Sequence, residues 1–238
     1  MNIGLALALI FFPAAFWIGY AYYHDRFKPE PLVLAAFSYF LGFLSGWLCF
    51  HAYDILLPVL GIPADPEAFQ GLNLAFLAYC IVVVGLVEEL FKFIPFLAAI
   101  THFSDFNDES DGIFYASALA LGFASYENVH YLPCLTGFAL YGRAIASPLS
   151  HSVFASIWGH PVGVAVIRRR GLRPAILKGV GLAALLHGLF DFLTFSPLLR
   201  IFSALLILAA WLWRIRASER LAKQKLQTDD RNQTSVRA

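Results

Sequence analysis

The sequence predicts an all-α, polytopic transmembrane helix bundle with about seven spans. Of its 238 residues, 59% are apolar and only 14% are charged, and the mean hydropathy is +0.68. Soluble domains are about a quarter charged, so this composition excludes an ordinary soluble globule. The apolar residues also form long runs separated by short polar or Pro- and Gly-containing breaks, as repeated membrane crossings require. The formal net charge of +1 argues against a nucleic-acid partner.

Seven apolar stretches approach the length of about 20 residues that crosses about 30 Å of hydrocarbon. The first has no Lys or Arg before it, so we expect a retained span rather than a cleaved signal peptide. The second and third stretches follow Pro-containing breaks, and the fourth stretch follows an acidic segment. The fifth stretch follows Arg143, and the sixth follows a basic turn. The seventh is the shortest, with 16 residues. In chain order the predicted spans are 3–22, 32–53, 72–100, 112–132, 144–167, 175–195 and 198–213.

Basic residues predict how the chain is oriented in the membrane. Residues 1–213 form the predicted transmembrane domain, and residues 214–238 form a basic tail that we expect to be cytoplasmic and partly disordered. Fourteen of the 17 Lys and Arg residues follow the first, fifth and seventh spans, whereas only Arg143 and Arg200 fall on the other side. The positive-inside rule therefore places the N-terminus outside and the C-terminus inside. Since the chain carries no organelle address, we expect a multi-pass protein of a bacterial plasma membrane, with the lipid bilayer as its partner.

The third predicted span carries three charged side chains, Glu88, Glu89 and Lys92. A charge inside a span costs several kcal/mol, so it persists mainly where it faces the bundle interior and serves a function. On a helix, Lys92 lies four residues after Glu88 and three after Glu89, so it can pair with either carboxylate but cannot neutralise both. The remaining charge must be met by a proton, a metal ion or another helix.

Three further spans carry polar side chains at a similar depth. Glu88 and His187 each lie about 18 Å from the cytoplasmic ends of their spans, at about 1.5 Å per helical residue. Glu127 and His151 come somewhat nearer to the outer face. We therefore expect four helices to present these groups to one cavity within the membrane. The candidates on the three further spans are Glu127 with Asn128, then His151, and then His187 with Asp191 on one helix face.

The residues in these spans resemble the motifs of the PrsW family of intramembrane proteases, which is related to the CAAX-protease and bacteriocin-processing superfamily. The family pattern is EExxK, then FxxxE, then HxxxD, each on a separate membrane helix. Each motif alone is weak, but the three in order are specific. They occur here as Glu88-Glu89-Leu90-Phe91-Lys92, Phe123 to Glu127 and His187 to Asp191, and the segments at 111–115 and 143–151 also resemble the family.

The resemblance implies hydrolysis of peptide bonds in or beside the membrane, with membrane-anchored proteins as substrates. With the neighbouring polar residues added, it indicates five catalytic and four supporting candidates. Phe123 shares a helix face with Glu127, so we expect it to pack against the pocket wall. The catalytic candidates are Glu88, Glu89, Glu127, His187 and Asp191, and the supporting candidates are Lys92, Phe123, Asn128 and His151.

Two mechanisms remain open, one without a cofactor and one with zinc. Peptide hydrolysis needs an activated water, stabilisation of the oxyanion and a proton for the leaving amine. Without a metal, one of Glu88 and Glu89 acts as the general base, and Lys92 keeps the other ionised. Water orientation or oxyanion stabilisation then falls to His187 with Asp191, and proton donation to Glu127 or His151.

In the zinc mechanism, the metal-bound water reaches a pKa near 7 and acts as the nucleophile. The ligands would be His151, His187 and one or both of Glu88 and Glu89. Asp191 would then contact one of the imidazole ligands, without binding the zinc itself, and orient that ring. The sequence has no HExxH motif, which excludes the zincin arrangement.

Two other functions compete with proteolysis. A proton-coupled transporter also uses carboxylates and histidines within the membrane, but such proteins often have paired halves, and no second Glu-Glu segment matches the third span. A non-catalytic scaffold or immunity-type protein would use the polar groups only to join helices. Replacing Glu88 or Glu89 with Gln would then leave its function nearly intact, because an amide still forms hydrogen bonds.

Overall fold

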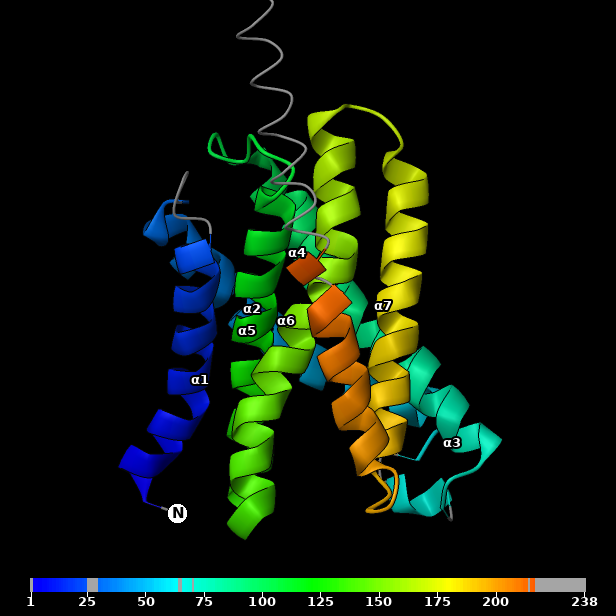
Figure 1. Cartoon of the computed structure of the whole chain (residues 1–238). Helices are drawn as coiled ribbons and strands as arrows, with labels where there is room; N and C mark the ends of the chain where they lie inside the picture. The colour runs from blue at the N-terminus through cyan, green and yellow to red at the C-terminus, as the bar shows by residue number, and fades with distance from the viewer. Residues whose placement is uncertain (1, 25–29, 64–65, 70, 214, 217–238) are drawn as a thin grey trace, which may run out of the picture.

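The computed structural model describes residues 2–24, 30–63, 66–69, 71–213 and 215–216, and these residues form helices and turns without a strand. This confirms the predicted all-α membrane bundle (Figure 1). Most of the predicted basic tail lies outside the described residues. The elements are α1 (Ile3–His24), α2 (Leu32–Leu60), η1 (Pro66–Phe69), α3 (Leu74–Ala78), η2 (Tyr79–Gly85), α4 (Leu86–Ala98), η3 (Ile100–His102), α5 (Asp111–Tyr131), η4 (Leu132–Cys134), α6 (Gly137–Ile167), α7 (Leu172–Thr194) and a helix Arg200–Trp213, here called the terminal helix.

Four helical segments are long and apolar enough to cross a membrane, so this is an integral membrane protein. Helices α5 and α6 are also long, with 21 and 31 residues, but contain more polar residues. In α5, 17 of the 21 residues are buried, so protein rather than lipid surrounds this helix and its polar side chains are tolerated. With the shorter terminal helix, the bundle is compatible with about seven spans. The four apolar segments are Ile3–Tyr23, Leu32–Leu60, Leu74–His102 and Leu172–Thr194.

Two helices extend beyond the boundaries that the sequence predicted. Helix α2 continues past residue 53 to Leu60 and ends at Gly61, whose φ of +64° belongs to the left-handed region that glycine adopts readily. Helix α6 begins at Gly137 rather than at residue 144, so Arg143 lies inside the helix. The predicted start of this span lay just after Arg143, because a charged residue lowers the local hydropathy. The helix nevertheless continues through Arg143, because its side chain pairs with Glu127.

The third predicted span is interrupted by a π-helix. The seven residues Tyr79–Gly85 separate α3 from α4, and π-helical turns are rare and frequent at functional sites. Two glycines allow α7 to pack directly on this segment. A Cβ on Gly85 would lie 2.4 Å from the carbonyl oxygen of Ala184, and one on Gly188 would lie 2.4 Å from that of Cys80. This close approach brings the polar face of α7 against the start of α4.

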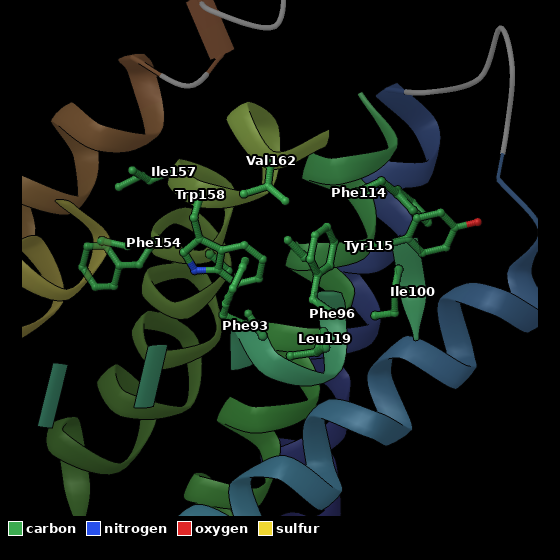
Figure 2. Packing of buried hydrophobic residues seen from close by; sticks show 14 of the residues in the cluster. Phe93, Phe96, Ile100, Phe114, Tyr115, Leu119, Phe154, Ile157, Trp158 and Val162 are labelled. Carbon is green, nitrogen blue, oxygen red and sulfur yellow. The ribbon is translucent and has the colours of Figure 1, made fainter. Parts of the chain in front are cut away.

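The apolar core lies between α4, α5 and α6, toward the end of the bundle that carries the α6–α7 turn (Figures 1 and 2). Trp158 is fully buried in it and meets Phe93 and Phe96 edge to face, with ring centroids 5.4 and 5.0 Å apart. Such aromatic pairs add stability beyond the burial of their area. The core therefore fixes the orientation of the Trp158 indole, which borders the polar residues described next.

Candidate active site

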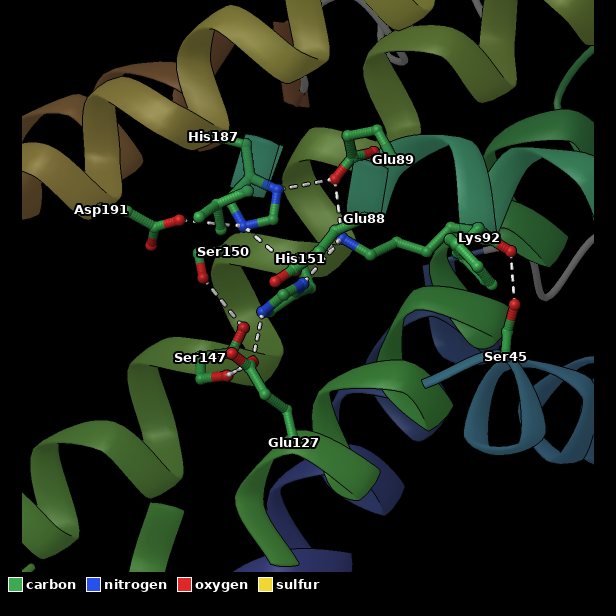
Figure 3. A network of polar contacts seen from close by, with 12 residues as sticks. Ser45, Glu88, Glu89, Lys92, Glu127, Ser147, Ser150, His151, His187 and Asp191 are labelled. Carbon is green, nitrogen blue, oxygen red and sulfur yellow. Dashed lines mark hydrogen bonds and ion pairs between the residues drawn. The ribbon is translucent and has the colours of Figure 1, made fainter. Parts of the chain in front are cut away.

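Side chains from four helices meet in one buried cluster of ionisable groups, here called the polar cluster (Figure 3). The side chains of all three sequence motifs and of His151 converge there, as the depth of their spans predicted. Asp191 and Arg143 are its most open members, with 27% and 28% of their side chains exposed. The polar cluster consists of Glu88, Glu89 and Lys92 on α4, Glu127 on α5, Arg143 and His151 on α6, and His187 and Asp191 on α7.

Glu89 is held by three donors and is fully buried. Its Oε1 atom accepts hydrogen bonds from Lys92 Nζ at 2.7 Å and from His187 Nδ1 at 2.9 Å. Its Oε2 atom accepts one from Trp158 Nε1 at 2.8 Å. Hydrogen bonds from cationic and neutral donors stabilise the ionised form of a carboxyl group. Glu89 is therefore an anchor that joins α4 to α6 and α7.

Glu88 differs from its neighbour because its Oε2 atom is buried and makes no hydrogen bond within the described residues. The nearest charged or imidazole nitrogen atoms are His187 Nε2 at 3.6 Å and Lys92 Nζ at 3.9 Å. Both distances exceed ordinary hydrogen-bond lengths. A buried polar atom without a partner is costly and calls for an explanation, such as a water, an ion or a substrate that occupies the adjacent space.

Lys92 is the buried cation of the cluster, with none of its side chain exposed. Besides Glu89, its ammonium group contacts His151 Nδ1 at 2.9 Å and lies 4.6 Å from the centroid of the Phe123 ring. A cation over an aromatic face is attracted by the ring quadrupole, and more strongly where water is excluded. Phe123 therefore packs against the polar cluster and contributes to holding the Lys92 ammonium group.

The hydrogen-bond pattern around His151 assigns its tautomer. An ammonium group can only donate, so Nδ1 accepts the hydrogen bond from Lys92. The proton is then on Nε2, which donates to Glu127 Oε2 at 2.9 Å. Both ring nitrogens of His151 are thus engaged, and the imidazole links Lys92 to Glu127.

His187 has one engaged nitrogen and one that faces the open part of the cluster. Its Nδ1 donates to Glu89 Oε1, because a carboxylate can only accept. Its Nε2 lies 3.6 Å from Glu88 Oε2 and 3.5 Å from Asp191 Oδ2. The ring also stacks on Phe154, with centroids 5.1 Å apart, which restricts its rotation. The Oε2 atom of Glu88, which has no hydrogen bond within the described residues, therefore faces Nε2 of His187.

Glu127 forms the side of the cluster nearest to Arg143. Its Oε1 atom pairs with Arg143 Nη2 at 2.9 Å, while its Oε2 atom contacts His151 and, at 3.4 Å, the Ser147 hydroxyl. The Arg143 guanidinium lies 4.1 Å from the ring centroid of Tyr131. Glu127 is thus bound to a cation and an imidazole on α6, so it joins α5 to α6.

Two contributors to the cluster were missed by the sequence analysis, and one candidate stays apart from it. Trp158 carries no charge and resembles any core aromatic, and Arg143 was placed outside its span. For Arg143, its spacing of eight residues from His151, two helical turns, was an available signal. Asn128 is fully buried, but neither polar atom of its side chain has a hydrogen-bond partner in the described part of the chain. Asn128 therefore has no hydrogen bond to the cluster.

The charges of the polar cluster do not balance by themselves. If all four carboxyl groups were ionised and both imidazoles neutral, two basic side chains would leave a net charge of −2, which is costly in a buried site. Two protons or one divalent cation would restore neutrality. Glu88, His151 and His187 each offer one ligand atom, and these atoms all lie within 4.8 Å of one another.

Comparisons with known proteins support one family. The model of the PrsW family of intramembrane metalloproteases matches residues 28–214. A curated Protease PrsW of Oceanobacillus iheyensis is 31% identical over 215 residues, which cover 87% of this chain and 93% of that protein. Relatives with the same name from Geobacillus kaustophilus and Bacillus subtilis are 29% and 26% identical, over 76% of this chain and 76% and 78% of their own lengths. No solved structure matches the chain.

Proposed function

Since the chain belongs to the PrsW family of intramembrane proteases, we propose that it hydrolyses a peptide bond of a membrane-anchored protein. The substrate bond is cut in the space between the Glu88 and His187 side chains. One observation carries this assignment, namely the buried, unbonded Oε2 atom of Glu88 that faces His187 Nε2 at 3.6 Å. A water molecule can contact two atoms at that separation, because each hydrogen bond spans about 2.8 Å. Glu88 is therefore the general base that takes a proton from this water.

Glu89 acts as a positioning residue in this proposal. Both of its oxygens are already engaged by Lys92, His187 and Trp158, and the side chain is fully buried, so it is less available to water than Glu88. A carboxylate behind an imidazole fixes the ring and stabilises its protonated form, as in carboxylate–histidine pairs of hydrolases. His187 then receives the proton and delivers it from Nε2 to the leaving amine. Asp191, 3.5 Å from the same nitrogen, keeps the ring turned toward the substrate.

Lys92 and the Glu127–Arg143 pair keep the reacting groups in place. Lys92 compensates Glu89 and orients His151, and His151 in turn holds Glu127. Because these contacts come from three helices, the geometry around Glu88 depends on the packing of the whole bundle. Preorganised charges in a water-poor site stabilise developing charge more effectively than water does.

The family description implies a metal ion, and the donors of the cluster are of the kind that zinc prefers. An imidazole nitrogen on each of two histidines and a carboxylate oxygen are ligands that zinc prefers, and the unbonded Glu88 oxygen needs a partner. Glu88, His151 and His187 would hold the ion, and His151 would first release Lys92 or Glu127. A bound ion would lower the pKa of the attacking water and offset the net negative charge. Glu89 would then fix His187 from behind, through Nδ1.

We further propose that the chain lies in a bacterial plasma membrane with its N-terminus outside. The α6–α7 turn carries Arg168, Arg169 and Arg170, and α7 begins with Arg173 in its first turn, which favours the cytoplasmic face for that end of the bundle. The apolar core around Trp158 would then lie in the inner half, with the polar cluster nearer the outer face. Substrates would be membrane-anchored proteins cut at that depth.

The proposed base can be tested without knowing the substrate. Membranes of cells that produce the wild-type chain or Glu88→Gln are compared by quantitative mass spectrometry of new protein termini. We expect termini in or beside transmembrane segments that depend on the wild-type chain and fall by a factor of at least about 100 with Glu88→Gln, since loss of a general base costs that much. Glu109→Gln is the matched control, because Glu109 pairs with Arg168 in a loop outside the cluster. The same termini in equal amounts with Glu88→Gln would refute the assignment.

Purified wild-type and His187→Ala proteins, added back to membranes that lack the chain, decide between the two ways of activating water. Metal content per chain is measured after dialysis with and without a chelator. About one zinc per chain in the wild type, lost in His187→Ala, would support the ion. Full activity of metal-free protein would support Glu88 acting alone as the base.

A further inference from the structure

An apolar groove lies on the far side of α7 from the π-helix, where the terminal helix packs beside α7 (Figure 1). Its volume is about 250 Å³. Ile157 of α6 forms its buried floor, and the walls include Leu182 and Leu186 from α7 and Leu206 and Trp213 from the terminal helix. The lining is almost entirely apolar, so the groove suits hydrocarbon rather than a polar ligand.

Two basic residues flank one end of this groove. Helix α7 and the terminal helix run in opposite directions, so the end near Trp213 is the end toward the start of α7. Lys178 lies one turn before Leu182 there, and Arg216 follows Trp213 by three residues. Both side chains are exposed, and neither has an ion-pair partner among the residues that the structure describes. The apolar groove thus opens toward a pair of available positive charges.

We propose that the groove holds one acyl chain of an anionic phospholipid whose headgroup phosphate is bound by Lys178 and Arg216. The volume exceeds that of the apolar cavities of about 150 Å³ that bind benzene, so it accommodates several methylene groups. An acyl chain gains little by moving from the bilayer into an apolar groove, because both surroundings are hydrocarbon. The selectivity must therefore come from the two cations, and these favour an anionic headgroup.

A protein helix fits the groove less well than an acyl chain does. A helix with its side chains is about 10 Å wide. An extended hydrocarbon chain is much narrower, so it can lie along the apolar groove between α7 and the terminal helix. The positive charges of Lys178 and Arg216 at one end of the apolar groove also match a phospholipid, because its charged headgroup lies at one end of its acyl chains.

Lipid titrations followed by native mass spectrometry test the proposal on the full-length protein in detergent. The probes are phosphatidylglycerol and phosphatidylcholine with identical acyl chains. We expect the wild type to retain at least about fivefold more phosphatidylglycerol than phosphatidylcholine. Lys178→Gln should retain about fivefold less phosphatidylglycerol than the wild type, which is the factor that corresponds to one surface cation. Ala210→Leu, which narrows the groove, should reduce retention of both lipids.

The matched control is Arg173→Gln, which removes the same charge from the other side of α7, since five residues turn a helix by about 140°. It should leave the retention of phosphatidylglycerol unchanged. Equal retention of the two lipids by the wild type, or an equal loss in Arg173→Gln and Lys178→Gln, would overturn the proposal. Cross-linking of a Leu206→Cys variant to a second copy of the chain would also overturn it, because a protein would then occupy the groove. None of these outcomes depends on proteolytic activity.

Discussion

The apolar core and the polar cluster lie on consecutive turns of the same helices, yet different interactions hold them. In the core, Trp158 packs edge to face against Phe93 and Phe96, and its contacts depend on shape and volume. In the cluster, Lys92 and Glu89 contact each other at 2.7 Å with neither side chain exposed, and their contact depends on charge. A change of volume should therefore loosen the core gradually, whereas loss of one charge should disrupt the cluster at once.

Trp158 belongs to both regions, and this shows how the two are coupled. Its ring is part of the core, while its N–H group holds Glu89 Oε2 at 2.8 Å. The core therefore determines which of the two adjacent glutamates is fully bonded. The Trp158 N–H group donates to Glu89 rather than to Glu88, one residue earlier, whose Oε2 atom has no hydrogen bond within the described residues. The difference between a hydrogen-bonded carboxylate and one with an unbonded oxygen thus arises from packing outside the motif.

The largest effect should come from Lys92→Met, which keeps the length of the side chain and removes its charge. Glu89 and Glu88 would then share a buried site without their cation, and His151 Nδ1 would lose its donor. Breaking a buried ion pair costs about 3–5 kcal/mol. We expect a correspondingly lower free energy of unfolding, followed by circular dichroism in detergent. Arg173→Met, at an exposed position, should change it by less than about 0.5 kcal/mol. A Lys92→Met protein as stable as wild type would show that the cluster is not held by charge.

A smaller but sharper contrast is expected between the two glutamates. In Glu89→Gln, the new amide NH₂ group faces one of the three donors that bind Glu89, and two donors cannot form a hydrogen bond. The change should therefore lower the free energy of unfolding by about 2–3 kcal/mol. Glu88→Gln changes a group whose Oε2 atom has no hydrogen bond, so its cost should stay below about 1 kcal/mol. Thermal unfolding of both variants under the same conditions measures the difference. If Glu88→Gln proved to be the less stable protein, the roles assigned to the two carboxylates would have to be exchanged.

Much of this contrast could be predicted from the sequence, because it follows from helix geometry. The spacing of Glu88, Glu89 and Lys92 along one helix predicts their ion pairs, and both occur. The rise per residue predicted that Glu88 and His187 share a depth, and they lie within 3.6 Å. Fold class and family were predictable for the same reason. Hydropathy and motif order are local properties of the chain.

The remaining features depend on contacts between helices, which no local pattern reports. The π-helix Tyr79–Gly85 has the composition of any apolar span, so nothing in it signals the altered backbone. The hydrogen bond from Trp158 to Glu89 joins positions 69 residues apart. Arg143 was assigned to a loop because a lone charge resembles a span boundary, and only its partner Glu127 explains why α6 begins earlier. Which carboxylate oxygen stays free is decided by such contacts.

The smallest difference in stability is expected between two variants of the core, and this pair tests the link between core and cluster directly. Trp158→Phe keeps an aromatic ring in the core but removes the N–H group that donates to Glu89, at a cost of about 2 kcal/mol. Phe96→Leu removes a similar amount of packing from the same core, and Phe96 makes no polar contact with the cluster. Both variants should unfold at lower temperatures than the wild type by similar amounts. Their activities should nevertheless differ, because Glu89 loses one of its three donors only in Trp158→Phe and can then turn away from His187. Measured by the same new protein termini, proteolysis should fall with Trp158→Phe and be retained with Phe96→Leu. Equal proteolysis in two equally destabilised variants would mean that Trp158 contributes only its volume, and that Glu89 is positioned by Lys92 and His187 alone.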